Sequence, residues 1–117
     1  MKVLAIDDDR MIGLLLETLL QTHPEHTLFV AQSFAEALAH FTKERPDVIL
    51  VDYHLPDATG SEVIKKLRGE LEYDGVILYF SATAPAKYLP KGCNGILDKP
   101  INPMTFVDDL ERRARGG

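Results

Sequence analysis

Side chains that could bind a cation or an anion follow four short apolar segments of this chain. The first segment leads into three consecutive aspartates, Asp7 to Asp9, and the segment DVILVD ends in Asp52. Ser81 and Lys99 stand at the ends of two further segments of this kind. Two like charges about 4 Å apart repel by roughly 4 kcal/mol at an effective dielectric constant near 20. A cluster of these aspartates therefore needs either exposure to water or a compensating cation.

Mg²⁺ is the cation that best fits such a cluster. It prefers carboxylate and carbonyl oxygens and keeps positions open for water or a phosphate, so Asp7, Asp8 and Asp52 are its candidate ligands. The Lys99 ammonium could pair with a carboxylate or phosphoryl oxygen, and the Ser81 hydroxyl could donate to the same oxygen. These groups suit phosphoryl transfer onto a carboxylate nucleophile, because positioning and charge neutralisation supply most of the catalysis.

The segments that must position these groups alternate between two patterns. Short runs of β-branched and other apolar residues alternate with stretches whose apolar residues recur at helical spacing. This alternation predicts parallel βα units, in which functional groups gather beyond the carboxyl ends of the strands. The predicted strands are 3–6, 27–31, 47–52, 75–81 and a fifth within GILDKP, 95–100.

Capping residues predict where the helices begin. Asp9 precedes the first helical pattern and is expected to cap it rather than to bind a metal. Ser33 and Glu36 predict a capping box for the second helix, and Asn102 and Pro103 are the expected cap and first position of the last. The helix that follows the turn LPDATG is predicted to bury Val63, Ile64, Leu67 and Leu71.

Proline and glycine interrupt two stretches between these elements. Pro85, Pro90 and Gly92 fall within 82–94, where a fourth helix would be expected, so any helix there should be short or irregular. In the turn LPDATG, Pro56 is expected to act through its fixed φ and Gly60 through its tolerance of positive φ.

Composition limits the class of protein. The 117 residues, of which 45% are hydrophobic, predict one globular domain. A formal net charge of −5, from 18 acidic and 13 basic residues, disfavours binding to nucleic acid or to an anionic membrane. Cys93, the single cysteine, fits a reducing compartment and is expected to be buried. Since no apolar run approaches the roughly 20 residues of a membrane span, the expected location is the cytoplasm.

The chain resembles the receiver domain of two-component response regulators over essentially its full length. Four motifs carry the resemblance: IDDD at 6–9, DYHLPDATG at 52–60, FSATA at 80–84 and DKP at 98–100. The resemblance implies a single receiver domain over 1–117. It also implies a flavodoxin-like, doubly wound α/β fold with a five-stranded parallel sheet of order 2-1-3-4-5.

The same resemblance implies a role for each candidate residue. Asp52 would be the phosphoacceptor, and Asp7, Asp8, Asp52 and the backbone carbonyl of His54 would bind Mg²⁺. Ser81 would be the switch hydroxyl and Lys99 the lysine that contacts the phosphoryl group, followed by a cis Lys99-Pro100 peptide bond.

The implied function is signalling by phosphorylation. A histidine kinase or phosphotransfer protein would donate the phosphoryl group to Asp52, and the modified domain would change its binding to a downstream protein effector. The domain would not be an enzyme in the ordinary sense, although it would support its own Mg²⁺-dependent phosphotransfer and autodephosphorylation. Two departures put output through the usual surface in doubt: Ile96 replaces the family's switch aromatic, and the segment from Ser81 to Lys99 is shorter than usual.

Three alternative functions fit these residues less well. A nucleotide binder of the same fold would need a first loop rich in small residues to cradle phosphate, whereas DDDR would repel it. A phosphatase with an aspartyl nucleophile would need a second catalytic carboxylate at position 54, and His54 occupies that position. A receiver-fold module that binds partners without phosphorylation stays open, and the intact set of candidate residues argues against it.

Overall fold

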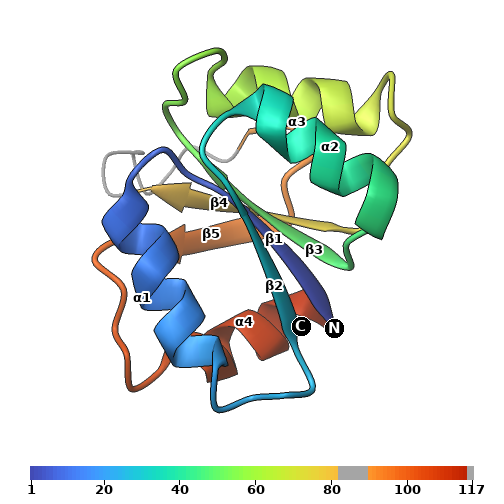
Figure 1. The fold of residues 1–117 in the computed structure, drawn as a ribbon. Coiled ribbons are helices and arrows are strands. Elements are labelled where there is room, and N and C mark those ends of the chain that lie inside the picture. Colours follow the sequence, from blue (N-terminus) through green and yellow to red (C-terminus); the bar gives the residue numbers. More distant parts are fainter. Residues whose placement is uncertain (82–89, 116–117) are drawn as a thin grey trace.

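A single five-stranded sheet organises the computed structural model, which describes residues 1–81 and 90–115. Within these residues the strand order is β2-β1-β3-β4-β5 and every neighbouring pair is parallel, which confirms the predicted doubly wound, flavodoxin-like α/β fold (Figure 1). The strands are β1 (Lys2–Ile6), β2 (Thr27–Ala31), β3 (Val48–Asp52), β4 (Val76–Ser81) and β5 (Gly95–Asp98). The helices in the described part are α1 (Arg10–Leu20), α2 (Phe34–Glu44), α3 (Gly60–Arg68) and α4 (Phe106–Ala114).

Helices cover both faces of the sheet. Side chains alternate between the two faces of a strand, so Val3 of β1 packs in a core with residues of α1 and α4, and Leu4 packs in a second core with residues of α2 and α3. Figure 1 shows these two helix pairs on opposite sides of the sheet. Because both faces are buried, the β3 sequence reads as a continuous apolar run rather than an alternating one.

The strand register brings the ends of the central strands to one edge. Ile6 of β1 pairs with Val51 of β3, so the residues that follow each of them, Asp7 and Asp52, are neighbours. Ser81, the last residue of β4, pairs with Asp98, the residue before Lys99. Each predicted site residue thus lies at or just beyond the carboxyl edge of the sheet.

Two of the predicted helix caps are confirmed, one of them in part. The Asp9 side chain accepts a hydrogen bond from the Met11 amide at 2.9 Å and caps α1. Ser33 accepts from the Glu36 amide at 3.1 Å. The reciprocal half of that capping box is absent, because the Glu36 carboxylate accepts from the Gln32 amide instead.

The predicted start of the last helix is wrong. Asn102 accepts a hydrogen bond from the Met104 amide at 2.9 Å, but this bond caps a turn over 103–105, and α4 begins only at Phe106. The turn is stabilised by the Asn102 carbonyl, which accepts from the amides of both Thr105 and Phe106. Leu71 likewise lies beyond the end of α3, although it still packs partly against the core.

The predicted short or irregular fourth helix falls mainly on 82–89, outside the described residues. The described remainder, 90–94, contains a turn with Gly92 at φ 92°. Cys93 is half-buried rather than buried, and its thiol donates to the Gly95 carbonyl at 3.0 Å. None of the helices in the described ranges has the length and apolar character required to cross a membrane.

Candidate functional site

Three carboxylates meet at the carboxyl edge of the sheet. Asp7, Asp8 and Asp52 each place one oxygen within 4.8 Å of the others, and these three residues are called the acidic cluster below. Asp7 is buried, with 2% of its surface exposed, Asp52 is half-buried and Asp8 is exposed. The cluster forms because β1 and β3 are adjacent and end in register.

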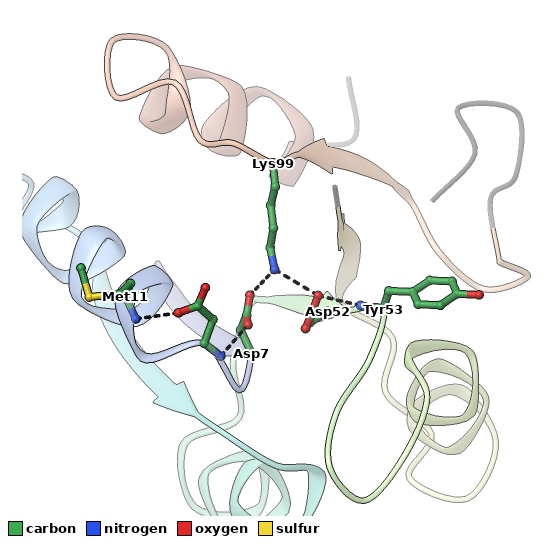
Figure 2. A network of polar contacts seen from close by, with 6 residues as sticks. Asp7, Met11, Asp52, Tyr53 and Lys99 are labelled. Carbon is green, nitrogen blue, oxygen red and sulfur yellow. Dashed lines mark hydrogen bonds and ion pairs between the residues drawn. The ribbon is translucent and has the colours of Figure 1, made fainter. Parts of the chain in front are cut away.

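Lys99 places a positive charge within this cluster. Its Nζ lies 2.5 Å from Asp7 Oδ2 and 3.0 Å from Asp52 Oδ1, as Figure 2 shows. The ammonium also lies 4.9 Å from the centre of the Phe80 ring. The Lys99-Pro100 peptide bond that follows is cis, as predicted. Lys99 therefore reaches the acidic cluster from the end of β5, two strands away from β3.

Main-chain amides orient two of the carboxylates. The Asp9 amide donates to Asp7 Oδ1 at 2.9 Å, and the Tyr53 amide donates to Asp52 Oδ1 at 2.9 Å (Figure 2). Both hydrogen bonds found for Asp52 within the described ranges thus fall on Oδ1, one from Tyr53 and one from Lys99. Among the residues that the structure describes, none hydrogen-bonds to its second oxygen, Oδ2, which is therefore assigned as the oxygen available to a ligand.

Residues 3–111 of the chain match the family described as response regulator receiver domain. The chain belongs to this family. The match covers 109 residues, from residue 3 to residue 111. This range includes the acidic cluster and Lys99. The motifs from which the resemblance was inferred all lie inside the matched range.

Relatives of this receiver domain include full-length chemotaxis proteins. A chemotaxis protein CheY homolog from Campylobacter jejuni is 27% identical over 117 residues, covering 95% of this chain and 90% of that protein. The solved structure of the chemotaxis response regulator CheY4 of Vibrio cholerae is 36% identical with a TM-score of 0.84, covering 96% of this chain and 97% of that one. The two-component response regulator ARR10 of Arabidopsis thaliana is 34% identical over 111 residues, which are only 20% of its length.

Burial and charge set the protonation behaviour of this receiver domain's site. Burial raises the pKa of Asp52, and the Asp7 charge raises it further, while Lys99 and the Tyr53 amide oppose this shift. Burial alone would lower the pKa of Lys99, but hydrogen bonds and charge from Asp7 and Asp52 outweigh it, so the pKa is raised. Lys99 is therefore a cation at neutral pH.

The donor set fits Mg²⁺. Receiver domains generally bind this ion at an acidic pocket, and the acidic cluster supplies hard carboxylate oxygens that one ammonium does not fully neutralise. Asp7, Asp8 and Asp52 are the residues that would hold the ion. His54 lies two residues beyond the end of β3 and pairs with Thr59 in an isolated bridge, and its carbonyl as a further ligand stays a prediction.

Ser81 is placed only through its backbone. It ends β4, beside the Asp98 position of β5, while its side chain lies outside the described part of the structure. Its role as the switch hydroxyl stays a prediction, as do the roles assigned to the other site residues.

The loop after Asp52 contains interactions that the sequence interpretation missed. Gly60 does not have a positive φ, contrary to expectation. Glycine is needed there for space, because a Cβ would lie 2.6 Å from the Asp52 carbonyl oxygen and 2.8 Å from a ring carbon of Tyr79. Thr59 and Glu62 form the complete capping box of α3, and the spacing T-x-x-E could have revealed it.

Proposed function

We propose that this receiver domain accepts a phosphoryl group on Asp52 from a histidine kinase or a phosphotransfer protein. The observation that supports the proposal is the position of the Asp52 carboxylate, at the end of β3, beside Asp7 and Asp8 and in contact with Lys99. Phosphorylation would then change the binding of a downstream protein effector. A single receiver domain over 1–117 is part of this proposal.

The chemical step uses Asp52 as the nucleophile. A carboxylate oxygen attacks phosphorus, the bond from phosphorus to the donor histidine nitrogen breaks, and its electron pair stays on that nitrogen. The Tyr53 amide and Lys99 hold Oδ1 of Asp52, so attack is assigned to Oδ2. The product is an acyl phosphate on the protein.

Charge neutralisation follows from the groups around the nucleophile. Mg²⁺, when bound, offsets the negative charge of the carboxylates and of the incoming phosphoryl oxygens. As charge develops on the phosphoryl group, the hydrogen bond that the Lys99 ammonium donates to Asp52 can shift to a phosphoryl oxygen. Ser81 is assigned to donate a hydrogen bond to another phosphoryl oxygen. Because Lys99 already contacts the Asp52 carboxylate, its ammonium needs little reorganisation at the moment of transfer.

Phosphotransfer from acetyl phosphate tests the proposal against a phosphorylation-independent binding module. Intact-mass measurement should show one added phosphoryl group in the presence of Mg²⁺ and almost none when the ion is chelated. Asp52→Asn should remain folded and gain no mass. Equal labelling with and without Mg²⁺ would refute the metal assignment, and modification at Asp7 or Asp57 would refute the nucleophile.

We propose that phosphorylation changes the binding of a different protein and does not drive dimerisation with a second copy of this chain. Ile96 lies on β5 opposite Tyr79, half-buried, and its branched side chain has restricted χ1 and no ring to exchange between solvent and core. Sedimentation with and without beryllofluoride, a phosphoryl mimic, tests this point. A mimic-dependent dimer that substitutions within 96–110 disrupt would contradict it.

A further inference from the structure

The carboxylate of Asp57 links the loop after the nucleophile to a helix elsewhere in the sequence. Its Oδ1 accepts a hydrogen bond from the Phe34 amide at 2.9 Å, and its Oδ2 accepts from the Ala35 amide at 3.0 Å. These amides belong to the first two residues of α2. Ser33 caps the third amide of α2, that of Glu36, at 3.1 Å. Two side chains from different parts of the chain thus share one helix terminus.

The other end of this loop contacts the acidic cluster. The Tyr53 amide donates to Asp52 Oδ1 at 2.9 Å, and the Tyr53 carbonyl accepts from the Gly60 amide at 2.8 Å. Between these points, the Leu55 amide donates to the Ala58 carbonyl at 3.0 Å, which closes the loop on itself. The 53–59 loop is therefore a compact unit with Asp52 at one end and Asp57 near its tip.

Among the residues that the structure describes, Asp57 is the residue of the 53–59 loop whose side chain hydrogen-bonds to α2. The two amide bonds from α2 lower its pKa, so it is ionised at neutral pH. A carboxylate at this position also interacts favourably with the positive end of the helix dipole, although exposure to water weakens this interaction. The pair of hydrogen bonds fixes the orientation of the carboxylate as well as its distance from α2.

We propose that Asp57 is a positioning residue of the phosphoacceptor site, which holds the 53–59 loop against α2 and thereby keeps Tyr53 and His54 in place beside Asp52. The inference rests on the proposed function for its consequence, since the loop carries the amide that orients the nucleophile and the carbonyl assigned to Mg²⁺. Residues that orient the groups around a metal typically change affinity for the metal by about ten- to a hundredfold when they are replaced. Asp57 acts through backbone groups, so the lower end of that range applies.

Ser33→Ala provides a matched control for Asp57→Ala. Each substitution removes a side-chain cap from the first turn of α2, so both weaken the same helix end. Only Asp57→Ala also releases the loop. Asp57→Asn keeps one oxygen acceptor and loses the charge, so its effects should fall between those of the wild type and Asp57→Ala.

Amide hydrogen exchange and Mg²⁺ titration by NMR provide readouts that need no phosphoryl donor. Exchange of the Tyr53 amide should be about tenfold faster in Asp57→Ala than in the wild type, and within about twofold of the wild type in Ser33→Ala. The Mg²⁺ dissociation constant should rise by about tenfold in Asp57→Ala only. Equal changes in the two alanine variants, or an unchanged Tyr53 amide in Asp57→Ala, would overturn the proposal.

These readouts separate the inference from the proposed function. If the wild type takes up no phosphoryl group and the Tyr53 amide still responds to Asp57→Ala alone, the proposed function fails and the positioning role stands. If the wild type is phosphorylated on Asp52 and the two alanine variants behave alike, the function stands and the positioning role fails.

Discussion

Replacing Lys99 with methionine tests whether its ammonium offsets the repulsion between the carboxylates of Asp7 and Asp52. Methionine keeps an unbranched apolar stem but removes the group that lies 2.5 Å from Asp7 Oδ2 and 3.0 Å from Asp52 Oδ1. The Lys99 side chain is only 15% exposed and that of Asp7 only 2%. Water therefore compensates poorly for the lost cation, and the two carboxylates face each other without it.

The size of the effect follows from two limits. The carboxylate oxygens lie within 4.8 Å of one another, and at an effective dielectric constant near 20 this separation gives a repulsion of roughly 3.5 kcal/mol. Proton uptake limits the cost, because protonating an aspartate of ordinary pKa costs about 4 kcal/mol at pH 7 and about 1.5 kcal/mol at pH 5. The free energy of unfolding should therefore fall by about 3 kcal/mol at pH 7 and by about 1.5 kcal/mol at pH 5.

The sign of the pH dependence follows from Asp52. Burial and the Asp7 charge already raise its pKa in the folded protein, and loss of the Lys99 ammonium would raise it further. A carboxyl group with a higher pKa in the folded state binds protons preferentially there, so acidification stabilises the folded variant relative to its unfolded chain. The difference in unfolding free energy between the wild type and Lys99→Met should accordingly decrease as the pH falls from 7 towards 5.

Urea denaturation in the presence of a chelator measures these values, with Lys2→Met as the matched control. Lys2 pairs with Glu44 at 3.6 Å on the surface, where its side chain is 47% exposed, so its loss should cost less than about 1 kcal/mol. Excess Mg²⁺ should restore more stability to Lys99→Met than to the wild type, because the ion replaces the missing cation. A small loss equal to that of the control, or a loss independent of pH, would refute the charge-balance argument.

Three further substitutions probe the site and its support. Asp8→Ala should raise the metal-free unfolding free energy by about 0.5 kcal/mol, because one repelling, exposed charge is removed, and should weaken Mg²⁺ binding in a titration; a loss of metal-free stability would contradict this. Gly60→Ala should lower the unfolding free energy by about 1–3 kcal/mol in urea, because its Cβ would meet the Asp52 carbonyl oxygen at 2.6 Å. Arg68→Ala removes a guanidinium that donates to three main-chain carbonyls and should cost about 2–3 kcal/mol. Lys66 is exposed and lies two residues away, so Lys66→Ala should change the unfolding free energy by less than about 0.5 kcal/mol. Equal losses in Arg68→Ala and Lys66→Ala would argue against a stabilising role for the Arg68 hydrogen bonds.

The strands were predictable because their sequence pattern has a direct physical cause. A strand covered by helices on both faces must be apolar at nearly every position, as in the run that became β3 (Val48–Asp52). The 27–31 prediction matches β2 (Thr27–Ala31), and the fifth strand was found within GILDKP as β5 (Gly95–Asp98). Helix ends were less predictable, since Asn102 hydrogen-bonds within a turn that precedes α4 instead of capping the helix itself.

The gathering of the site residues was also predictable, because it depends only on strand order and polarity. Asp7 directly follows β1 and Asp52 ends the adjacent parallel strand β3, so a sheet of this strand order brings the two carboxylates together. The chemical types of the residues then indicated a divalent cation. What each residue does in phosphoryl transfer stays a prediction that the experiments above address.

Local sequence determined the strands, the Asp9 and Ser33 caps and the identity of the charged groups, because these depend on neighbours along the chain and on the period of apolar residues. Tertiary structure alone decided that Asp57 binds the start of α2, 22–23 residues away, and that Gly60 is required for space rather than for its φ. Such contacts depend on where two separate elements approach each other, and no spacing within either segment carries that distance. The fold thereby connects an exposed loop aspartate to the first turn of a helix from another part of the chain.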